Sequence, residues 1–109
     1  MSKHILRFWF EHGGYCIWGE NNLSQELYGY AINVNKLPIS TTLINKLNEL
    51  TDEYATYLDW HEPINPTAWS EEKKLNFINK GNAVHQQLVI ELGENYTIRN
   101  ELHLCVEFH

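Results

Sequence analysis

Basic residues are scarce in this chain of 109 residues, which has 8 Lys and Arg against 14 Asp and Glu. The formal net charge is −6. Proteins that bind nucleic acids gain most of their affinity from clustered Lys and Arg, and anionic membrane surfaces attract similar clusters. The charge balance therefore argues against a nucleic-acid partner and against a membrane partner.

Long apolar runs and metal-binding cysteine patterns are also missing. No segment approaches the roughly 20 apolar residues of a membrane-spanning helix, and the apolar run at 5–10 is too short and too charged for a secretory signal. Cys16 and Cys105 have no CxxC or Cys/His zinc spacing around them, so we expect buried free thiols. The length fits a single domain, residues 1–109, which we expect in the cytoplasm.

The N-terminal sequence indicates a β-hairpin. Residues 3–10 and 15–18 are rich in β-branched and aromatic side chains. Such residues favour strands, and the two glycines between the segments supply a turn. We therefore expect two antiparallel strands joined by a loop at 12–15.

Other short elements are predicted on both sides of the chain's centre. Residues 20–28 fit a short helix that ends at Gly29, and residues 30–37 fit either a third strand or an extended connection. At the C-terminus, residues 96–99 and 102–108 again have strand-like composition.

A long helix is predicted to begin after Ser40, which can cap its first turn. Its apolar residues recur every three or four positions, as on one face of a helix. Two prolines follow closely and disfavour helical geometry in the residues before them, so this helix should stop near Asp59.

A second long helix is predicted between Ser70 and Gly93, which suit its N-terminal and C-terminal caps. One face carries Phe77, Ile78, Gly81, Val84, His85, Leu88 and Leu92. On that face Gly81 allows a neighbouring element to approach closely. The whole pattern predicts an α+β fold: an antiparallel sheet, made of the N-terminal hairpin and C-terminal strands, packed against two long helices.

Acidic residues concentrate between Lys46 and Lys73, where no other Lys or Arg occurs. The stretch contains Glu49, Asp52, Glu53, Asp59, Glu62, Glu71 and Glu72, with Tyr54, Tyr57, Trp60 and Trp69 among them. A surface of one charge sign destabilises a protein through self-repulsion, and aromatic side chains are common in binding hot spots. The pattern favours binding of a basic partner.

The first long helix carries part of this charge as a stripe. Its polar positions Glu49, Asp52, Glu53, Thr56 and Asp59 are three or four residues apart. Negative charge near a helix C-terminus opposes the helix dipole, and like charges at this spacing repel each other. The stripe is therefore either a partner-binding surface or a solvated face whose acids form ion pairs elsewhere in the fold.

Two tryptophans belong to the proline-containing segment 60–69 between the helices. Trp60 and Trp69 either fill the end of the core or serve as binding anchors beside the acids, since a rigid loop loses little entropy on docking. Exposure of the two side chains distinguishes these alternatives.

Catalytic and metal-binding patterns are absent from the sequence: the six histidines form no HxH or HExxH motif, and no glycine pattern frames a nucleophilic serine. We expect no enzyme, no cofactor and no metal. One alternative is a small metal- or ligand-dependent enzyme with its site at the hairpin loop, using Glu11, His12 and His61. Another is a subunit of a larger assembly that associates through an exposed apolar sheet face.

Motifs along nearly the whole chain resemble a family of small acidic bacterial proteins. They are LRFWFEHGG at 6–14, Trp18, Asn22, YG at 28–29, LPIS at 37–40, LDW at 58–60, Pro63, Pro66, WSEE at 69–72, FIN at 77–79 and ELG at 91–93. By similarity to proteins encoded beside polymorphic or contact-dependent toxins, the resemblance implies an immunity protein. Its expected partner is a cognate basic toxin of the nuclease class.

This implication agrees with the acidic surface, which is able to imitate the charge of a nuclease substrate. The residues expected to pair with toxin Lys or Arg are Glu49, Asp52, Glu53, Asp59 and Glu62. Trp60 and Trp69 are the expected anchors.

Overall fold

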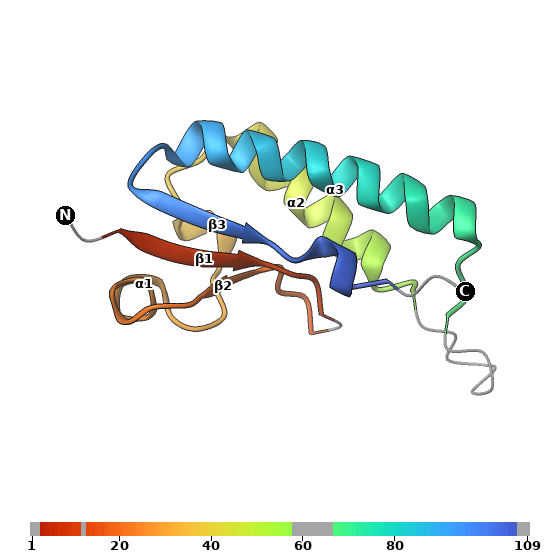
Figure 1. The fold of residues 1–109 in the computed structure, drawn as a ribbon, viewed down its shortest axis with the longest axis horizontal. Helices are drawn as coiled ribbons and strands as arrows, with labels where there is room; N and C mark the ends of the chain where they lie inside the picture. Colours follow the sequence, from red (N-terminus) through yellow and green to blue (C-terminus); the bar gives the residue numbers. More distant parts are fainter. Residues whose placement is uncertain (1–2, 12, 58–66, 107–109) are drawn as a thin grey trace.

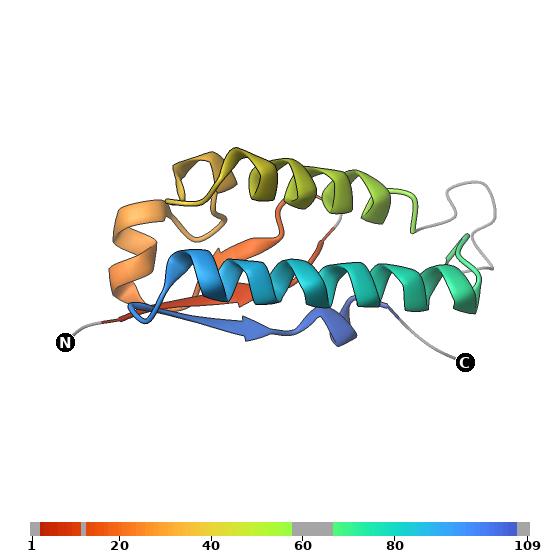
Figure 2. The same cartoon turned by 90° about the horizontal axis from the view of Figure 1, so that it is seen from above.

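The structure is a computed structural model that describes residues 3–11, 13–57 and 67–106. Its elements are β1 (His4–Phe8), β2 (Ile17–Gly19), α1 (Asn22–Tyr28), the 3-10 helix η1 (Val34–Lys36), α2 (Thr41–Tyr54), α3 (Glu71–Leu92), β3 (Tyr96–Asn100) and the 3-10 helix η2 (Leu102–Leu104). The strands form one sheet in the order β2-β1-β3. Helices α2 and α3 lie side by side over one face of it (Figure 1, Figure 2).

The predicted N-terminal hairpin is confirmed. Strands β1 and β2 pair antiparallel, with Arg7 opposite Trp18 and Phe8 opposite Ile17. The backbone pairing continues beyond the two strands. Trp9 N–H donates to the Cys16 carbonyl at 3.0 Å. The prediction of a short helix that ends at Gly29 is also confirmed, and Gly29 has a positive φ of 92°.

The prediction of a purely antiparallel sheet is wrong, because β3 pairs parallel to β1. Helix α3 runs the length of the sheet and returns the chain to the end where β1 begins, so β3 starts there (Figure 1). The first contact is the hydrogen bond from His4 N–H to the Asn95 carbonyl, at 2.9 Å. Residues 102–104, expected as strand, form η2 instead, where Leu102 turns into the core.

Both long helices begin where they were predicted. Ser40 and Ser70 accept hydrogen bonds from the first turns of α2 and α3, and Gly93 caps the end of α3. However, α2 ends at Tyr54 rather than near Asp59. The following residues form a tighter turn that directs Tyr57 into the core, where it stacks on Tyr54 with ring centroids 5.4 Å apart.

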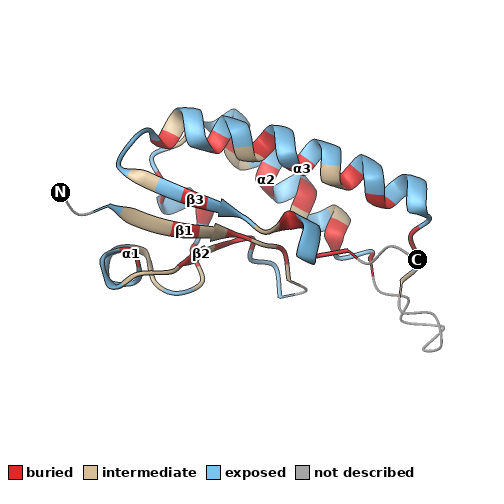
Figure 3. Cartoon of the chain, viewed as in Figure 1, coloured by how far each residue is buried: buried red, intermediate tan, exposed pale blue. Residues whose placement is uncertain are grey.

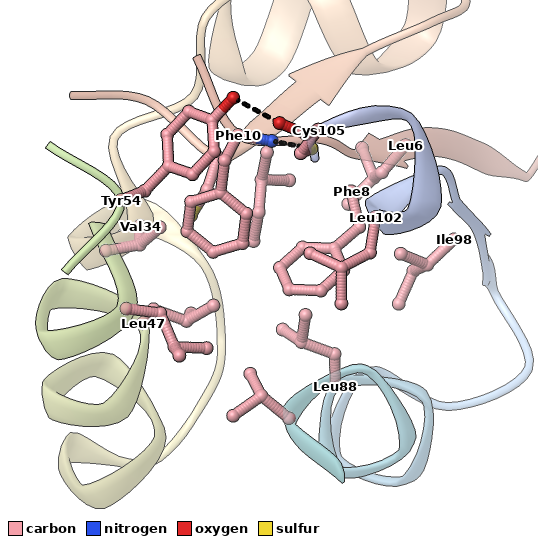
Figure 4. Close-up of a cluster of buried hydrophobic side chains, with 14 of the residues drawn as sticks. Leu6, Phe8, Phe10, Val34, Leu47, Tyr54, Leu88, Ile98, Leu102 and Cys105 are labelled. Carbon is pink, nitrogen blue, oxygen red and sulfur yellow. Dashed lines mark hydrogen bonds between the residues drawn. The ribbon is translucent and has the colours of Figure 1, made fainter. Parts of the chain in front are cut away.

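The core lies between the sheet and the inner sides of α2 and α3, where buried residues face the strands (Figure 3). Hydrogen bonds to Cys105 close one end of this core (Figure 4). The Tyr54 hydroxyl donates to the Cys105 carbonyl at 2.6 Å, and Phe10 N–H donates to Cys105 Sγ at 3.1 Å. They join α2, the end of β1 and the C-terminal segment. Among the described helices, none is long and apolar enough to cross a membrane.

Gly81 marks the closest approach of α3 to the C-terminal segment. A Cβ placed at this position would overlap the side-chain carbons of Leu102, which is fully buried. The predicted close approach at Gly81 is therefore confirmed.

We predict that Gly81→Ala lowers the free energy of unfolding by about 1–2 kcal/mol, because overpacking against Leu102 outweighs the better helix propensity of alanine. Urea denaturation measures this change. The exposed Asn76→Ala in the same helix is the control and should be neutral or slightly stabilising. Adding Leu102→Ala should reduce the penalty of the extra methyl group. A stabilised Gly81→Ala protein would contradict the close packing.

Cys16 and Cys105 are buried free thiols, as predicted. Burial raises the pKa of Cys16 from 9.0 to about 12 and that of Cys105 from 9.0 to about 11. Between the unfolded and folded pKa values the folded state retains protons that the unfolded chain releases. Stability is therefore complete below the unfolded pKa and falls as pH rises through this interval.

We predict that the free energy of unfolding decreases as pH rises from about 9 toward about 11, and that this decrease is smaller in Cys16→Ala. Denaturation at a series of pH values measures both slopes. Equal slopes in the two proteins would show that the Cys16 thiol does not resist ionisation in the fold.

Candidate functional site

Helix α2 is fixed to α3 at its first turn. The Ser40 side chain accepts a hydrogen bond from Leu43 N–H at 3.2 Å. Glu91 of α3 in turn accepts from Ser40 N–H at 2.6 Å and from the Ser40 hydroxyl at 2.9 Å. Hydrogen bonds from the Gln87 side chain and from Ser40 hold the pKa of Glu91 below its usual value. These contacts set the position of α2 beside α3.

The outward side of α2 carries the predicted acidic stripe. The inner side buries Leu43, Leu47, Leu50 and Tyr54. On the other side Glu49 and Asp52 are exposed, while Glu53 is partly buried. The structure brings these three acids together because they are three or four residues apart on one helix. We call Glu49, Asp52 and Glu53 the acidic surface of α2.

A groove of about 590 Å³ runs between α2 and α3 beside this surface. It is lined by Lys46, Glu49, Leu50, Glu53, Lys80, Ala83, Val84 and Gln87. Acidic, basic and apolar groups all contribute to its walls.

Glu53 has two carboxylate oxygens in different environments. Its Oε1 forms an ion pair with Lys80 Nζ at 2.5 Å, across from α2 to α3. Its Oε2 is buried and accepts no hydrogen bond from the described residues.

Trp69 belongs to the core, so the expectation that it anchors a partner needs correction. Its side chain is 6 % exposed and packs against Phe77 with ring centroids 5.1 Å apart. The indole N–H donates to Thr56 Oγ1 at 2.8 Å. Trp69 therefore fills the end of the core, which was the other predicted role. A side chain with so little accessible area cannot form a large contact with a partner.

Three other expected contact residues, Asp59, Trp60 and Glu62, lie outside the described residues. Their proposed roles in partner binding stay predictions.

The alternative site at the hairpin loop receives no geometric support from the described part of the chain. Glu11 is partly buried beside the turn, whereas His12 and His61 lie outside the described residues. Within residues 3–11, 13–57 and 67–106, no group of three or more His, Cys, Asp and Glu side chains has a metal-binding arrangement. His85 has a structural partner, since its Nε2 lies 2.8 Å from the Ile98 carbonyl oxygen.

Sequence reasoning missed the contribution of α3 to the groove. Lys80, Ala83 and Gln87 follow each other at three- and four-residue spacing, next to the buried stripe of α3. That spacing places them on one face. The sequence contains no signal that this face lies opposite the acids of α2, because the packing of the two helices decides it.

The fold and this surface define a small protein of mixed helix and sheet with a charged groove between its two long helices. A family model described as Serratia CdiI immunity protein-like matches residues 4–100, so the chain belongs to this family. The predicted resemblance to immunity proteins is confirmed. Immunity proteins of this type bind a cognate toxin. A search of curated proteins found no match.

We predict that Trp69→Phe lowers the free energy of unfolding by about 1–3 kcal/mol, because the indole hydrogen bond and part of the core packing are lost. Toxin affinity per folded molecule should stay unchanged, since Trp69 is buried. Chemical denaturation and calorimetric titration with the toxin measure the two quantities. A large loss of affinity in a fully folded Trp69→Phe protein would restore the anchor interpretation.

Proposed function

We propose that this chain is an immunity protein that binds and neutralises a cognate basic toxin of the nuclease class in the cytoplasm. The acidic surface of α2 and the adjoining groove form the proposed contact. In this proposal the chain acts by occupying the toxin, without catalysis of its own and without a cofactor.

The observation that carries the proposal is the concentration of acids along the groove between two long helices. Glu49 and Asp52 are exposed beside it. Arg or Lys of a partner would pair with these groups through charge-assisted hydrogen bonds. Such bonds are roughly twice as strong as neutral ones.

A nuclease is the toxin class that best fits this surface. Its active-site cleft must attract phosphates and is therefore basic. Negative carboxylates on a rigid helix imitate the substrate charge and raise the rate of encounter through electrostatic steering. Fast capture matters for an immunity protein, because a free toxin destroys nucleic acid before a slow inhibitor arrives.

Basic residues also line the groove, and they determine which acids are available. Lys80 neutralises one oxygen of Glu53, and Lys46 lies next to Glu49 in the wall of the groove. Glu49 and Asp52 therefore provide the exposed negative charge. For this reason Glu49 and Asp52 are the acids to replace, with the Glu53–Lys80 pair left intact.

The function itself is tested by expressing this chain in cells that are susceptible to the toxin domain encoded beside it. Protection against that toxin, without protection by an unrelated immunity protein, would support the proposal. Death of the cells, together with no complex between the purified proteins at low salt, would contradict it.

We predict that Glu49→Lys with Asp52→Lys slows toxin association by about tenfold or more at low salt, because steering toward a basic cleft is lost. Stopped-flow or surface-binding kinetics measure the rate. Glu26→Lys with Glu94→Lys changes the net charge equally at exposed positions outside α2 and is the matched control. Equal slowing by both double variants would show that net charge, and not the acidic surface of α2, directs the encounter.

A further inference from the structure

Four aromatic side chains cluster on the sheet face that points away from α2 and α3. Leu6 and Phe8 of β1 face the helices, so Arg7 and, directly after the strand, Trp9 point to the opposite side. Arg7 lies opposite Trp18 of β2. Trp18 contacts the other three rings, with centroid distances of 6.0 Å to Trp9, 6.0 Å to Tyr15 and 5.4 Å to Tyr30. We call Trp9, Tyr15, Trp18 and Tyr30 the aromatic face.

Core packing does not account for the aromatic face. Tyr30 is 61 % exposed and Tyr15 is 43 % exposed, while Trp9 and Trp18 are partly buried. Only Trp9 of these four packs against the hydrophobic core. Neighbouring exposed aromatic rings are unfavourable in water and are typical of protein contact sites.

Two rings of the aromatic face, Trp9 and Trp18, are held in place by other groups. The Trp18 indole N–H donates to the Trp9 carbonyl at 2.8 Å. The Arg7 guanidinium lies over the Trp9 ring, 4.5 Å from its centroid. Arg7 also forms ion pairs with Glu101 and, at 3.9 Å, with Glu20. Because these contacts fix the Trp9 and Trp18 rings before binding, docking on those two rings would cost little conformational entropy.

Charge indicates the chemistry of the partner. Glu20 and Glu101 flank Arg7, so the three groups together carry one negative charge, and the chain carries −6. Arg7 itself shows the arrangement that this face favours: a guanidinium stacked on an indole and held by carboxylates. Cations are attracted to Trp and Tyr rings by their electron-rich faces. A second copy of this acidic chain would bring more negative charge.

The aromatic face also adjoins α2 around the edge of β2. A shallow hollow of about 120 Å³ lies between them, with Tyr15 and Asn33 on one side and Asn48 and Thr51 of α2 on the other. Asn48 and Asp52 are one helical turn apart. A single partner is therefore able to contact the acidic surface of α2 and the aromatic face together.

We propose that the aromatic face is a second contact surface for the same toxin, on which Arg or Lys side chains of the toxin stack against Trp18, Tyr15 and Tyr30. This inference rests on the proposed function. It adds to the acidic surface of α2 a surface whose recognition depends on aromatic rings as well as on charge.

The test compares toxin affinity between wild type and Tyr15→Ala with Tyr30→Ala, measured by calorimetry at two salt concentrations. We expect the double variant to bind at least tenfold more weakly, since truncated aromatic hot spots have effects of this size. Both tyrosines are exposed, so the fold should be retained, and circular dichroism and thermal unfolding verify it. Trp18 is left in place because its indole holds Trp9.

Two control variants test whether the aromatic rings themselves form the contact with the toxin. Tyr15→Phe with Tyr30→Phe keeps the rings and should bind like wild type, since stacking needs the ring and not the hydroxyl. Ile90→Ala removes a side chain that is 72 % exposed on α3 and should also leave affinity unchanged. Equal weakening by the Ala and Phe variants would overturn the stacking interpretation.

The outcomes separate this inference from the proposed function. If wild type binds the toxin and the Ala variant binds equally well, the second surface is wrong while the proposed function stands. If wild type does not bind the toxin, both are wrong. If sedimentation shows a wild-type dimer that the Ala variant does not form, the aromatic face is a self-association surface and the toxin contact is overturned.

Discussion

In β1, the central strand, neighbouring side chains divide between two environments, and the rest of the structure depends on this division. Leu6 and Phe8 of this strand, and Phe10 just after it, are fully buried beneath α2 and α3. Their neighbours Arg7 and Trp9 point to the other side, where they form part of the aromatic face. A shift of one residue in register would exchange the two sets and bury a charge. The alternation of side chains along this one strand therefore decides which residues enter the core and which form the outer face of the sheet.

The two long helices have a comparable division of roles. Their inner sides complete the core, and at Gly81 a missing side chain lets α3 reach Leu102. Their outer sides enclose the charged groove, where the Glu53–Lys80 pair joins α2 to α3. An exposed pair of this kind contributes little to stability. Its effect is to leave Glu49 and Asp52 as the available acids, which suits a surface that attracts a basic partner.

Much of the fold was predictable because local signals determine local structure. Ser40 and Ser70 mark helix starts because their hydroxyls accept from backbone N–H groups three residues on, and Gly93 marks a helix end because its own N–H donates to the Val89 carbonyl. The acids of α2 share a side because helix spacing alone requires it. The parallel pairing of β3 and the short end of α2 were not predictable in this way. They depend on where α3 returns the chain and on how Tyr57 packs against Trp69, which are contacts between residues distant in the sequence.

The sequence by itself determined the charge, the caps and the two helix faces, and its motifs indicated the immunity-protein family, because composition and spacing are properties of the chain alone. The tertiary structure decided which of those features meet. Packing buried Trp69 beneath Thr56, placed Lys80 against Glu53, and gathered Trp9, Tyr15, Trp18 and Tyr30 on one face. Lys80 lies far from Glu53 in the chain, and Tyr30 lies outside the hairpin that carries the other three rings, so the arrangement of sheet and helices brings them into contact.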